Sequence, residues 1–217
     1  MIQWSYSSLK DYINCPKQYY HTKVAQDFLK KDTDQIQYGK EVHKALEDYV
    51  CRGVPLVKNY QRFQKPLDAL LEINGDRYCE YEMALTKEKE PCAFDSETRW
   101  VRGVTDLLVI DGTDAYIIDY KTGSNKYPDS KQLKLMALMT YAHFPSVEKI
   151  KAGLLFVLHN SFISEEYTRN EINKLWNNFL PHLSQLEMSF ASNTWVVKPG
   201  GLCGWCPVNT CKFYRER

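Results

Sequence analysis

The sequence predicts an α/β or α+β domain, in which a mixed central sheet is flanked by helices on both sides. Two observations lead to this fold class. Segments with the alternation of β-strands lie in mid-chain, and amphipathic helical segments lie before and after them. The length of 217 residues suits one full domain, and an apolar share of 44% is ordinary for a chain that buries a core.

Helices are predicted where apolar residues recur at helical spacing between start and stop signals. Ser5 is a capping residue, and Pro16 suits the first turn of a second helix. A capping box at residues 168–171 opens a long helix, with Pro181 as a kink. From Asn193 onward the chain is irregular and rich in Gly, Pro and Cys. The other helices are predicted at residues 5–14, 16–24, 36–50, 65–73 and 130–142.

Strands are predicted at residues 77–85, 100–110, 114–121 and 152–158. Residues 110–115 read IDGTDA, and an Asp-Gly pair between two strand-like segments is a strong hairpin signal. With Gly112 and Thr113 at the tip, and provided that no bulge shifts the register, Asp106 faces Asp119 with Cβ atoms roughly 4.5–5.5 Å apart. Because like charges directly opposite destabilise a sheet, a compensating cation is expected at this pair.

The stretch IIDYKTG, residues 117–123, places Asp119 and Lys121 on one face of a strand, since residues two apart share a face. A lone Asp-x-Lys at a strand end is more commonly a surface ion pair. The opposed Asp106 favours a cluster of two acids and a base, which can hold a metal and a phosphate. Carboxylate oxygens are ligands suited to Mg²⁺ or Mn²⁺.

Three further residues are candidates for the same cluster, namely His43, Gln132 and Glu82. Gly39 lies one turn before His43, and because helical side chains lean toward the N-terminus, a glycine there would leave space over the imidazole for a metal. Taken alone, a half-exposed helical histidine is the commoner interpretation of His43. Gln132, at the start of the helix after the strand, carries no signal by itself. Glu82 is interpreted as a solvated strand carboxylate in preference to a further acid of the site.

The seven cysteines are many for a chain of this length, and an odd number cannot all form disulfides within it. Four of them stand near the two ends of the chain, as Cys15, Cys203, Cys206 and Cys211. In a reducing compartment such a group more often indicates a metal site than disulfides. The remaining three, Cys51, Cys79 and Cys92, show no motif spacing and are expected to be small buried hydrophobes or inert thiols.

The charges of the chain nearly balance, with 28 Lys and Arg against 27 Asp and Glu and a net charge of +1. This balance does not indicate nucleic acid, although a basic groove can lie opposite an acidic face. No apolar run reaches membrane-spanning length and the first residues do not form a signal peptide, so we expect a cytoplasmic protein. If the chain is virus-encoded, this means the host cytoplasm. The chain has no P-loop and so no ATP-driven motor of its own, and it would act either without a motor or with one borrowed from a partner.

Taken together, the motifs resemble the PD-(D/E)XK nuclease superfamily and, more narrowly, its RecB-like branch. The matching segments are Gly39-x-x-x-His43, Gly103-Val-Thr-Asp106, Asp119-Tyr-Lys121 and Gln132-x-x-x-Met136. The last departs from the family's Q-x-x-x-Y pattern, because methionine stands in place of the tyrosine. The four terminal cysteines resemble the iron–sulfur staple of AddB-type and CRISPR-adaptation nucleases.

The resemblance implies a restriction-endonuclease-like fold in a single domain, residues 1–217, with a catalytic core at residues 36–160. It also implies that residues 1–25 and 195–217 form a clasp, in which the four terminal cysteines hold a [4Fe–4S] cluster. A Cys₄ zinc site is the rival interpretation. In either case the two ends of the chain would be joined by a metal centre.

The resemblance further implies a Mg²⁺- or Mn²⁺-dependent deoxyribonuclease, acting as an exonuclease on single-stranded DNA or DNA ends in recombination, repair or replication. It implies His43, Asp106, Asp119 and the backbone carbonyl of Tyr120 as metal ligands. Lys121 would position the attacking water or counter the developing charge, and Gln132 would help to position Lys121 or the scissile strand. A helicase or recombination protein is a possible partner. The alternative is a non-catalytic DNA-binding or assembly module with a structural zinc or iron–sulfur site.

Overall fold

The computed structural model describes residues 2–29, 33–126 and 128–215, and the chain folds into two compact units. The larger unit is Asp34–Trp176. The smaller unit combines the two ends of the chain, Met1–Thr33 and Asn177–Arg217. The organisation as one domain, with its clasp and core, stays a prediction.

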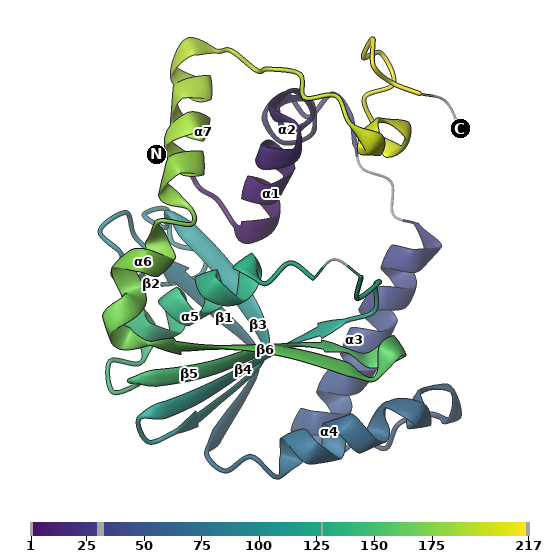
Figure 1. Ribbon diagram of the computed structural model, residues 1–217, viewed down its shortest axis with the longest axis vertical. Coiled ribbons are helices and arrows are strands. Elements are labelled where there is room, and N and C mark those ends of the chain that lie inside the picture. Colours follow the sequence, from purple (N-terminus) through teal and green to yellow (C-terminus); the bar gives the residue numbers. More distant parts are fainter. Residues whose placement is uncertain (1, 30–32, 127, 216–217) are drawn as a thin grey trace. The chain divides into compact units, whose positions relative to one another are not determined.

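The larger unit contains a six-stranded mixed sheet with the strand order β2-β1-β3-β4-β5-β6 (Figure 1). All neighbouring strands are antiparallel except β4 and β5, which are parallel and lie on either side of helix α5 in the sequence. This confirms the prediction of a mixed sheet flanked by helices. The strands are β1 (Asp76–Leu85), β2 (Pro91–Cys92), β3 (Val101–Asp111), β4 (Asp114–Lys121), β5 (Lys149–Phe156) and β6 (Ser161–Thr168).

The sequence prediction missed the two edge strands, β2 and β6. Strand β2 has only two residues, too few for any alternation to be seen. Strand β6 pairs with β5 along its whole length, after a turn in which Asn160 takes a left-handed conformation with φ of 46°. Its sequence SFISEEYT is polar enough to resemble a loop, because an edge strand exposes much of its surface.

Helices cover both faces of this sheet (Figure 1). Helices α3 (Asp34–Arg52) and α4 (Gln64–Leu71) pack on one face. Helices α5 (Lys131–His143) and α6 (Ile172–Trp176) lie on the other. The core under α3 and α4 is fully apolar except for the Tyr120 hydroxyl, and it consists of Val42, Leu46, Val50, Leu56, Phe63, Leu67, Leu70, Leu107, Val109, Ile118, Tyr120, Leu155 and Val157.

The β3–β4 hairpin has the register that its turn predicts. Asp111 pairs with Asp114 and Ile110 with Ala115, and Gly112 at the tip has a φ of 60°, which favours glycine. The ladder ends at the pair of Leu107 and Ile118. It therefore stops one pair short of the two aspartates that the sequence places opposite each other.

The smaller unit is held together by contacts between the two ends of the chain. Its helices are α1 (Tyr6–Asn14), α2 (Pro16–Tyr19), which continues into a π-helical turn (Tyr20–Val24), and α7 (Leu180–Ser192). The Tyr12 hydroxyl lies 2.8 Å from the Ser189 hydroxyl, and the Lys198 ammonium donates to the Ile13 carbonyl at 2.8 Å. Trp195 packs among four aromatic rings, those of Tyr12, Tyr19, Tyr20 and Phe190.

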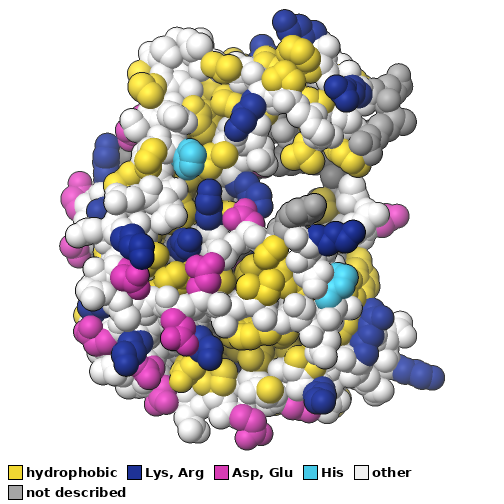
Figure 2. All heavy atoms as spheres, in the orientation of Figure 1, with side chains coloured by type: hydrophobic (Ala, Val, Ile, Leu, Met, Phe, Trp, Pro, Cys, Tyr) yellow, Lys and Arg dark blue, Asp and Glu magenta, His cyan; other side chains and the backbone are white. Residues whose placement is uncertain are grey.

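The remaining short helices are 3₁₀ turns at Lys58–Phe63, Val157–His159, Arg169–Glu171 and Gly201–Trp205. No helix within the described residues is long and apolar enough to span a membrane. On the face shown in Figure 2, Lys and Arg side chains are intermixed with Asp and Glu side chains, which agrees with the near-zero net charge.

The prediction of one long helix after residue 168 is wrong. The capping box between Thr168 and Glu171 is present, but the helix that follows ends at Trp176 and α7 begins at Leu180. Pro181 lies in the first turn of α7 and does not kink a continuous helix. A proline within the helix would lack its N–H and would clash with the carbonyl four residues before it, so the chain breaks there.

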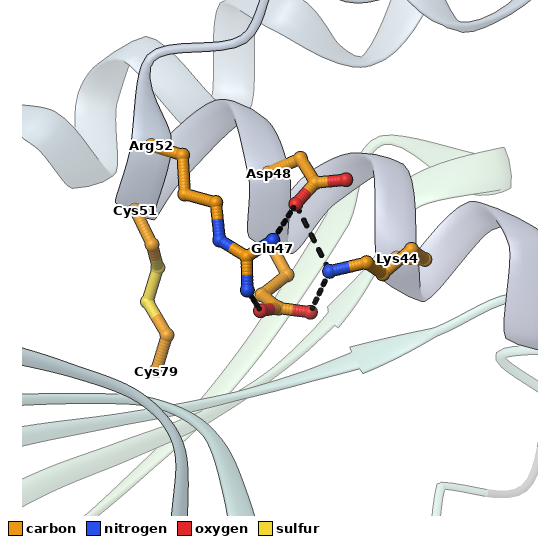
Figure 3. The surroundings of a disulfide bond; sticks show 6 residues. All are labelled: Lys44, Glu47, Asp48, Cys51, Arg52 and Cys79. Carbon is orange, nitrogen blue, oxygen red and sulfur yellow. Dashed lines mark hydrogen bonds and ion pairs between the residues drawn. A yellow bond between two sulfur atoms is a disulfide. The ribbon is translucent and has the colours of Figure 1, made fainter.

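The prediction that Cys51 and Cys79 are inert buried thiols is also wrong. They form a disulfide with a Cα–Cα distance of 6.4 Å, which joins the last turn of α3 to β1 (Figure 3). Beside it, Lys44 and Arg52 each form ion pairs with both Glu47 and Asp48. The two cysteines show no motif spacing, since only the packing of α3 on the sheet brings them together.

Replacement of Cys51 by Ser should lower the free energy of unfolding by about 3–4 kcal/mol, because the bond closes a loop with a sequence separation of 28 in the unfolded chain. Urea unfolding of the two proteins, without reductant, measures this difference. Cys92→Ser is the matched control, since Cys92 is a free half-buried cysteine of the same unit. Equal midpoints for the parent and Cys51→Ser would contradict the expectation.

Candidate active site

Strands β3 and β4 separate at the level of the two aspartates. Beyond the pair of Leu107 and Ile118 the backbone ladder stops, and the amide of Tyr120 donates to Oδ2 of Asp106 at 2.6 Å. A side-chain carboxylate thus accepts the hydrogen bond that a backbone carbonyl of β3 would otherwise accept. The separation fixes the Asp106 carboxylate against the end of β4, next to Asp119.

The Asp119 carboxylate is buried, with a relative exposure of 6%, and lies in a closed set of contacts with Lys121 and Gln132. The Gln132 amide nitrogen donates to Oδ1 of Asp119 at 2.6 Å. The Lys121 ammonium lies 2.5 Å from Oδ2 of Asp119 and donates to the Gln132 amide oxygen at 3.0 Å. Strand alternation places Asp119 and Lys121 on one face, and α5 begins close enough for Gln132 to contact both.

Burial raises the pKa of Asp119 from 3.8 to about 6. The charge of Lys121 opposes this shift, and the charge of Asp106 adds to it. The ionised form of Asp119 therefore costs free energy in the folded protein at neutral pH, because the contacts around the carboxylate replace only part of its lost hydration. A further positive charge at this position would lower the free energy of the ionised form.

His43 reaches the same place from helix α3, with Nδ1 lying 3.5 Å from Oδ2 of Asp106. Its ring packs edge-on against the ring of Tyr120, with centroids 6.0 Å apart. Burial acts to lower the pKa of His43, but the hydrogen bond and the charge of Asp106 outweigh burial and raise it. The histidine is thus oriented toward the acids by contacts on two sides.

Gly39 lies close to the residue that follows β4. A Cβ atom there would lie 3.2 Å from the Thr122 hydroxyl, which follows directly after Lys121 in the chain. The absence of a side chain at Gly39 therefore lets α3 lie close to the Thr122 side chain, one turn of helix before His43. That Gly39 also leaves space over the His43 imidazole for a metal stays a prediction.

Met136, which stands where the family pattern has a tyrosine, is part of the core. It is 3% exposed and accepts a weak hydrogen bond from the Thr105 hydroxyl at a distance of 3.7 Å. A Cβ atom on Gly103 would lie 2.5 Å from the terminal methyl group of Met136, so the methionine fills the space that this glycine leaves. Met136 is therefore a packing residue, whereas Gln132, one turn earlier, reaches Asp119 and Lys121.

The types of donor suit a hard divalent cation, since they combine carboxylate oxygens with one imidazole. Oδ2 of Asp119 is buried and takes part in no hydrogen bond, so its ion pair with Lys121 is its only compensating contact that the structure describes. Within the described residues, however, no three His, Cys, Asp or Glu side chains are arranged as a metal site. Both oxygens of Asp119 instead face Lys121 or Gln132.

Sequence reasoning missed Glu80 of β1. The pairs that flank it are Cys79 with Leu107 and Tyr81 with Thr105, so Glu80 lies opposite Asp106. Glu80 is exposed, as Glu82 is, and the pKa of Glu80 is raised by the partial loss of water around it and by the charge of Asp106. The pairing of β1 with β3 spans the connection 86–100, whose length no turn signal fixes, so the register could not be counted from the sequence. Glu82, the acid considered from the sequence, lies opposite Val104 and is exposed.

The four terminal cysteines line one cavity in the smaller unit, with a volume of about 240 Å³. The Gly200 amide donates to the sulfur of Cys203 at 3.3 Å, and the Val208 amide donates to that of Cys206. Burial raises the pKa of the Cys206 thiol, and the neighbouring cysteines Cys15, Cys203 and Cys211 add to the shift. Thiols with amide donors on their sulfurs are suited to hold a metal centre as thiolates.

A family model described as PD-(D/E)XK nuclease superfamily matches residues 3–211. The crystal structure of a "putative exonuclease" from Eubacterium rectale has a TM-score of 0.55 at 10% identity, covering 99% of this chain and 88% of that one. The crystal structure of SSO0001 covers 100% of this chain and 89% of that one at 13% identity, with a TM-score of 0.41. Identities this low show the fold alone, and no curated protein matches the sequence.

Replacement of Asp119 by Asn should stabilise the metal-free protein at pH 7. Because the folded-state pKa lies above the unfolded value, the stability linked to the protonated form is fully present below pH 3.8 and is lost as pH rises through about 6. The gain at pH 7 is up to about 3 kcal/mol, since one pKa unit corresponds to about 1.4 kcal/mol.

Urea unfolding in EDTA at pH 4 and pH 7 measures this gain. The difference between Asp119→Asn and the parent should shrink toward zero at the lower pH. Asp114→Asn, a half-buried aspartate at the other end of the same strand, is the matched control. A destabilised Asp119→Asn at pH 7 would contradict the assigned cause of the shift.

Proposed function

The chain belongs to the PD-(D/E)XK nuclease superfamily, and from that premise we propose that it hydrolyses phosphodiester bonds of DNA with a bound divalent cation. The observation that carries the proposal is the closed contact of the buried Asp119 with Lys121 and Gln132, beside Asp106 and His43. This set combines two acids, an imidazole and a base at the point where two strands separate.

The proposed ligands of Mg²⁺ or Mn²⁺ are His43, Asp106, Asp119 and the backbone carbonyl of Tyr120. When bound, such a cation lowers the pKa of a coordinated water and neutralises charge on the phosphate. Lys121 would donate to the attacking water or to the negative charge that develops on the phosphate oxygens.

Gln132 is proposed to act through its neighbours. Its amide nitrogen holds Asp119 and its amide oxygen holds the Lys121 ammonium, so one side chain fixes the acid and the base relative to each other. An amide is suited to this place because it offers a donor to the carboxylate and an acceptor to the ammonium.

For the substrate we propose single-stranded DNA or DNA ends, cut as an exonuclease of the RecB-like branch. The ordered motifs of that branch and the exonuclease name of the Eubacterium rectale protein support this choice. The sequence contains no P-loop, so unwinding of a duplex would need a helicase or recombination partner. We further propose that the protein acts in the cytoplasm, in recombination, repair or replication.

Replacement of Asp119 or Lys121 by Ala should reduce DNA cleavage by about 10³-fold or more, because each removes a charge that acts on the reacting phosphate. The assay uses protein purified without oxygen, end-labelled single-stranded and blunt duplex DNA, and Mn²⁺. Excess EDTA should abolish cleavage by the parent.

The control variants are Asp114→Ala and Lys149→Ala, which alter an acid and a base of neighbouring strands at the sheet end away from the site. A folded Asp119→Ala protein that cleaves as fast as the parent would overturn the assignment and leave a non-catalytic DNA-binding module. Equal or faster attack on blunt duplex would overturn the preference for single strands alone.

For the cysteine cavity we propose a [4Fe–4S] cluster held by Cys15, Cys203, Cys206 and Cys211. The number and type of the residues support this cluster, since a [4Fe–4S] cluster is held by four thiolates. Hydrogen bonds to the sulfurs adjust the reduction potential of such a cluster. The shared cavity and the two amide donors support it as well. Because the ligands come from both ends of the chain, the cluster would act on stability more than on the chemical step.

Replacement of Cys15 by Ala should lower the melting temperature, because the metal centre closes a loop of nearly the whole chain. By analogy with disulfides, this closure adds roughly 4–5 kcal/mol to the free energy of unfolding. Protein prepared without oxygen should be brown, with broad absorbance near roughly 400 nm that the variant lacks.

Iron, sulfide and zinc analysis accompanies the spectra, with Cys92→Ala as the control that should keep the colour. A colourless protein with one bound zinc would favour the Cys₄ zinc site instead. Parent protein that holds neither iron nor zinc, with a Cys15→Ala variant equally stable, would contradict both kinds of centre.

A further inference from the structure

The bond between Cys51 and Cys79 differs from the state of the other cysteines. Within the described part of the chain the other five cysteines are free, and four of them line the cavity proposed to hold a metal centre as thiolates. Disulfides are rare in a reducing compartment, and those that occur there are usually transient, with catalytic or redox-sensing roles. In the cytoplasm proposed for this protein, one disulfide among free thiols therefore fits a bond that opens and closes better than a permanent one.

The two cysteines of the bond differ in their exposure. Cys51 is exposed in the last turn of α3, whereas Cys79 is half-buried and packs against the core under α3 and α4 (Figure 3). A reductant therefore attacks the sulfur of Cys51. Exposed disulfides are the labile and regulatory ones, because access to a sulfur sets the rate of thiol–disulfide exchange.

The bond joins the helix and the strand pair that carry two of the proposed metal ligands. Helix α3 carries His43, about two turns of helix before Cys51. Strand β1 pairs with β3, and Cys79 lies opposite Leu107, the residue after Asp106. The bond therefore ties the helix of the imidazole to the strands of the acid, whose Oδ2 lies 3.5 Å from Nδ1 of His43.

The last turn of α3 extends beyond the apolar core. Val50 is the last residue of α3 in that core, and residues 51–55 are exposed. The ion pairs of Arg52 stay within the helix, and the Tyr49 hydroxyl donates to Asp68 of α4. The disulfide ties this exposed turn to β1, so reduction frees it. A metal site weakens when its supporting contacts hold the ligands about 1 Å too loosely.

We propose that the bond between Cys51 and Cys79 is a redox switch that regulates the proposed nuclease site. In the oxidised protein the bond fixes α3 to β1 and thereby holds His43 beside Asp106. In the reduced protein the helix is held less firmly, so the divalent cation binds more weakly and DNA cleavage slows. The inference rests on the proposed function and adds the regulation of that site by a dithiol reductant.

Reduction follows the chemistry of thiol–disulfide exchange. One thiolate of the dithiol attacks the sulfur of Cys51 and forms a mixed disulfide, while Cys79 leaves as a thiolate and takes up a proton. The second thiolate of the dithiol then attacks its own partner sulfur in the mixed disulfide, and Cys51 leaves and is protonated in turn. Two electrons and two protons pass from the dithiol, which becomes a disulfide, to the two cysteines.

Titration of the two redox states with Mn²⁺ tests the switch without nuclease activity. Protein purified without oxygen is freed of divalent cations, and one part is reduced with excess dithiothreitol, which is then removed. Alkylation and mass spectrometry report the state of Cys51 and Cys79, and the electron paramagnetic resonance of free Mn²⁺ reports binding. The reduced protein should bind Mn²⁺ about tenfold more weakly, as when a group that supports metal ligands is lost. Reoxidation with oxidised glutathione should restore the affinity.

Two variants separate the bond from other effects of the reductant. Cys51→Ser, which cannot form the bond, should bind Mn²⁺ as weakly as the reduced parent, with or without dithiothreitol. Cys92→Ser, which removes a free cysteine of the same unit, is the matched control and should respond as the parent does. The circular dichroism of the reduced and oxidised parent should agree, and DNA cleavage at low Mn²⁺ should fall with the affinity.

Equal Mn²⁺ affinity of the oxidised and reduced parent would overturn the switch and leave the nuclease proposal intact. A bond that stays closed in excess dithiothreitol, or a protein that unfolds when the bond opens, would also overturn it, because the bond would then be structural. A parent that binds no Mn²⁺ in either state would overturn both the switch and the proposed function.

Discussion

The buried negative charge of Asp119 is the constraint on which the rest of the site depends. A carboxylate that is almost removed from water is stable only if other groups replace the lost hydration. Lys121 replaces part of it from the same strand, and Gln132 replaces part from the helix that follows. The parallel pairing of β4 and β5 requires a crossover, and α5 is that crossover. The topology of the sheet and the composition of the site are thus linked.

The separation of β3 from β4 gives the site its second acid. In a continuous ladder the backbone groups of two strands satisfy each other, and carboxylates on them would only repel. Here the Tyr120 amide is satisfied by Asp106 itself, so the carboxylate is held in place by a backbone donor. The site therefore lies where the backbone pairing of β3 and β4 ends. The apolar core under α3 and α4 stabilises the fold against the repulsion between the acids.

Helix α3 places the histidine because its other face is fixed. Val42, Leu46 and Val50 bury one stripe of the helix against the sheet, and the disulfide ties the end of the helix to β1. His43 lies at the rim of that stripe, one residue after Val42, where a helical side chain is half-buried and faces the end of the strands. Gly39 lets this part of the helix approach the end of β4. The position of one imidazole thus depends on packing along three turns of helix.

The sequence by itself determined the features that depend on neighbouring residues. The Asp-Gly turn set the register of the hairpin, strand alternation put Asp119 and Lys121 on one face, and helical periodicity located α3. Only the tertiary structure decided which distant segments meet, because such contacts depend on the packing of whole elements and leave no local pattern. Glu80 opposite Asp106 and the bond between Cys51 and Cys79 are of this kind. Both follow from the position of β1 between β3 and the end of α3, a position that no turn signal fixes.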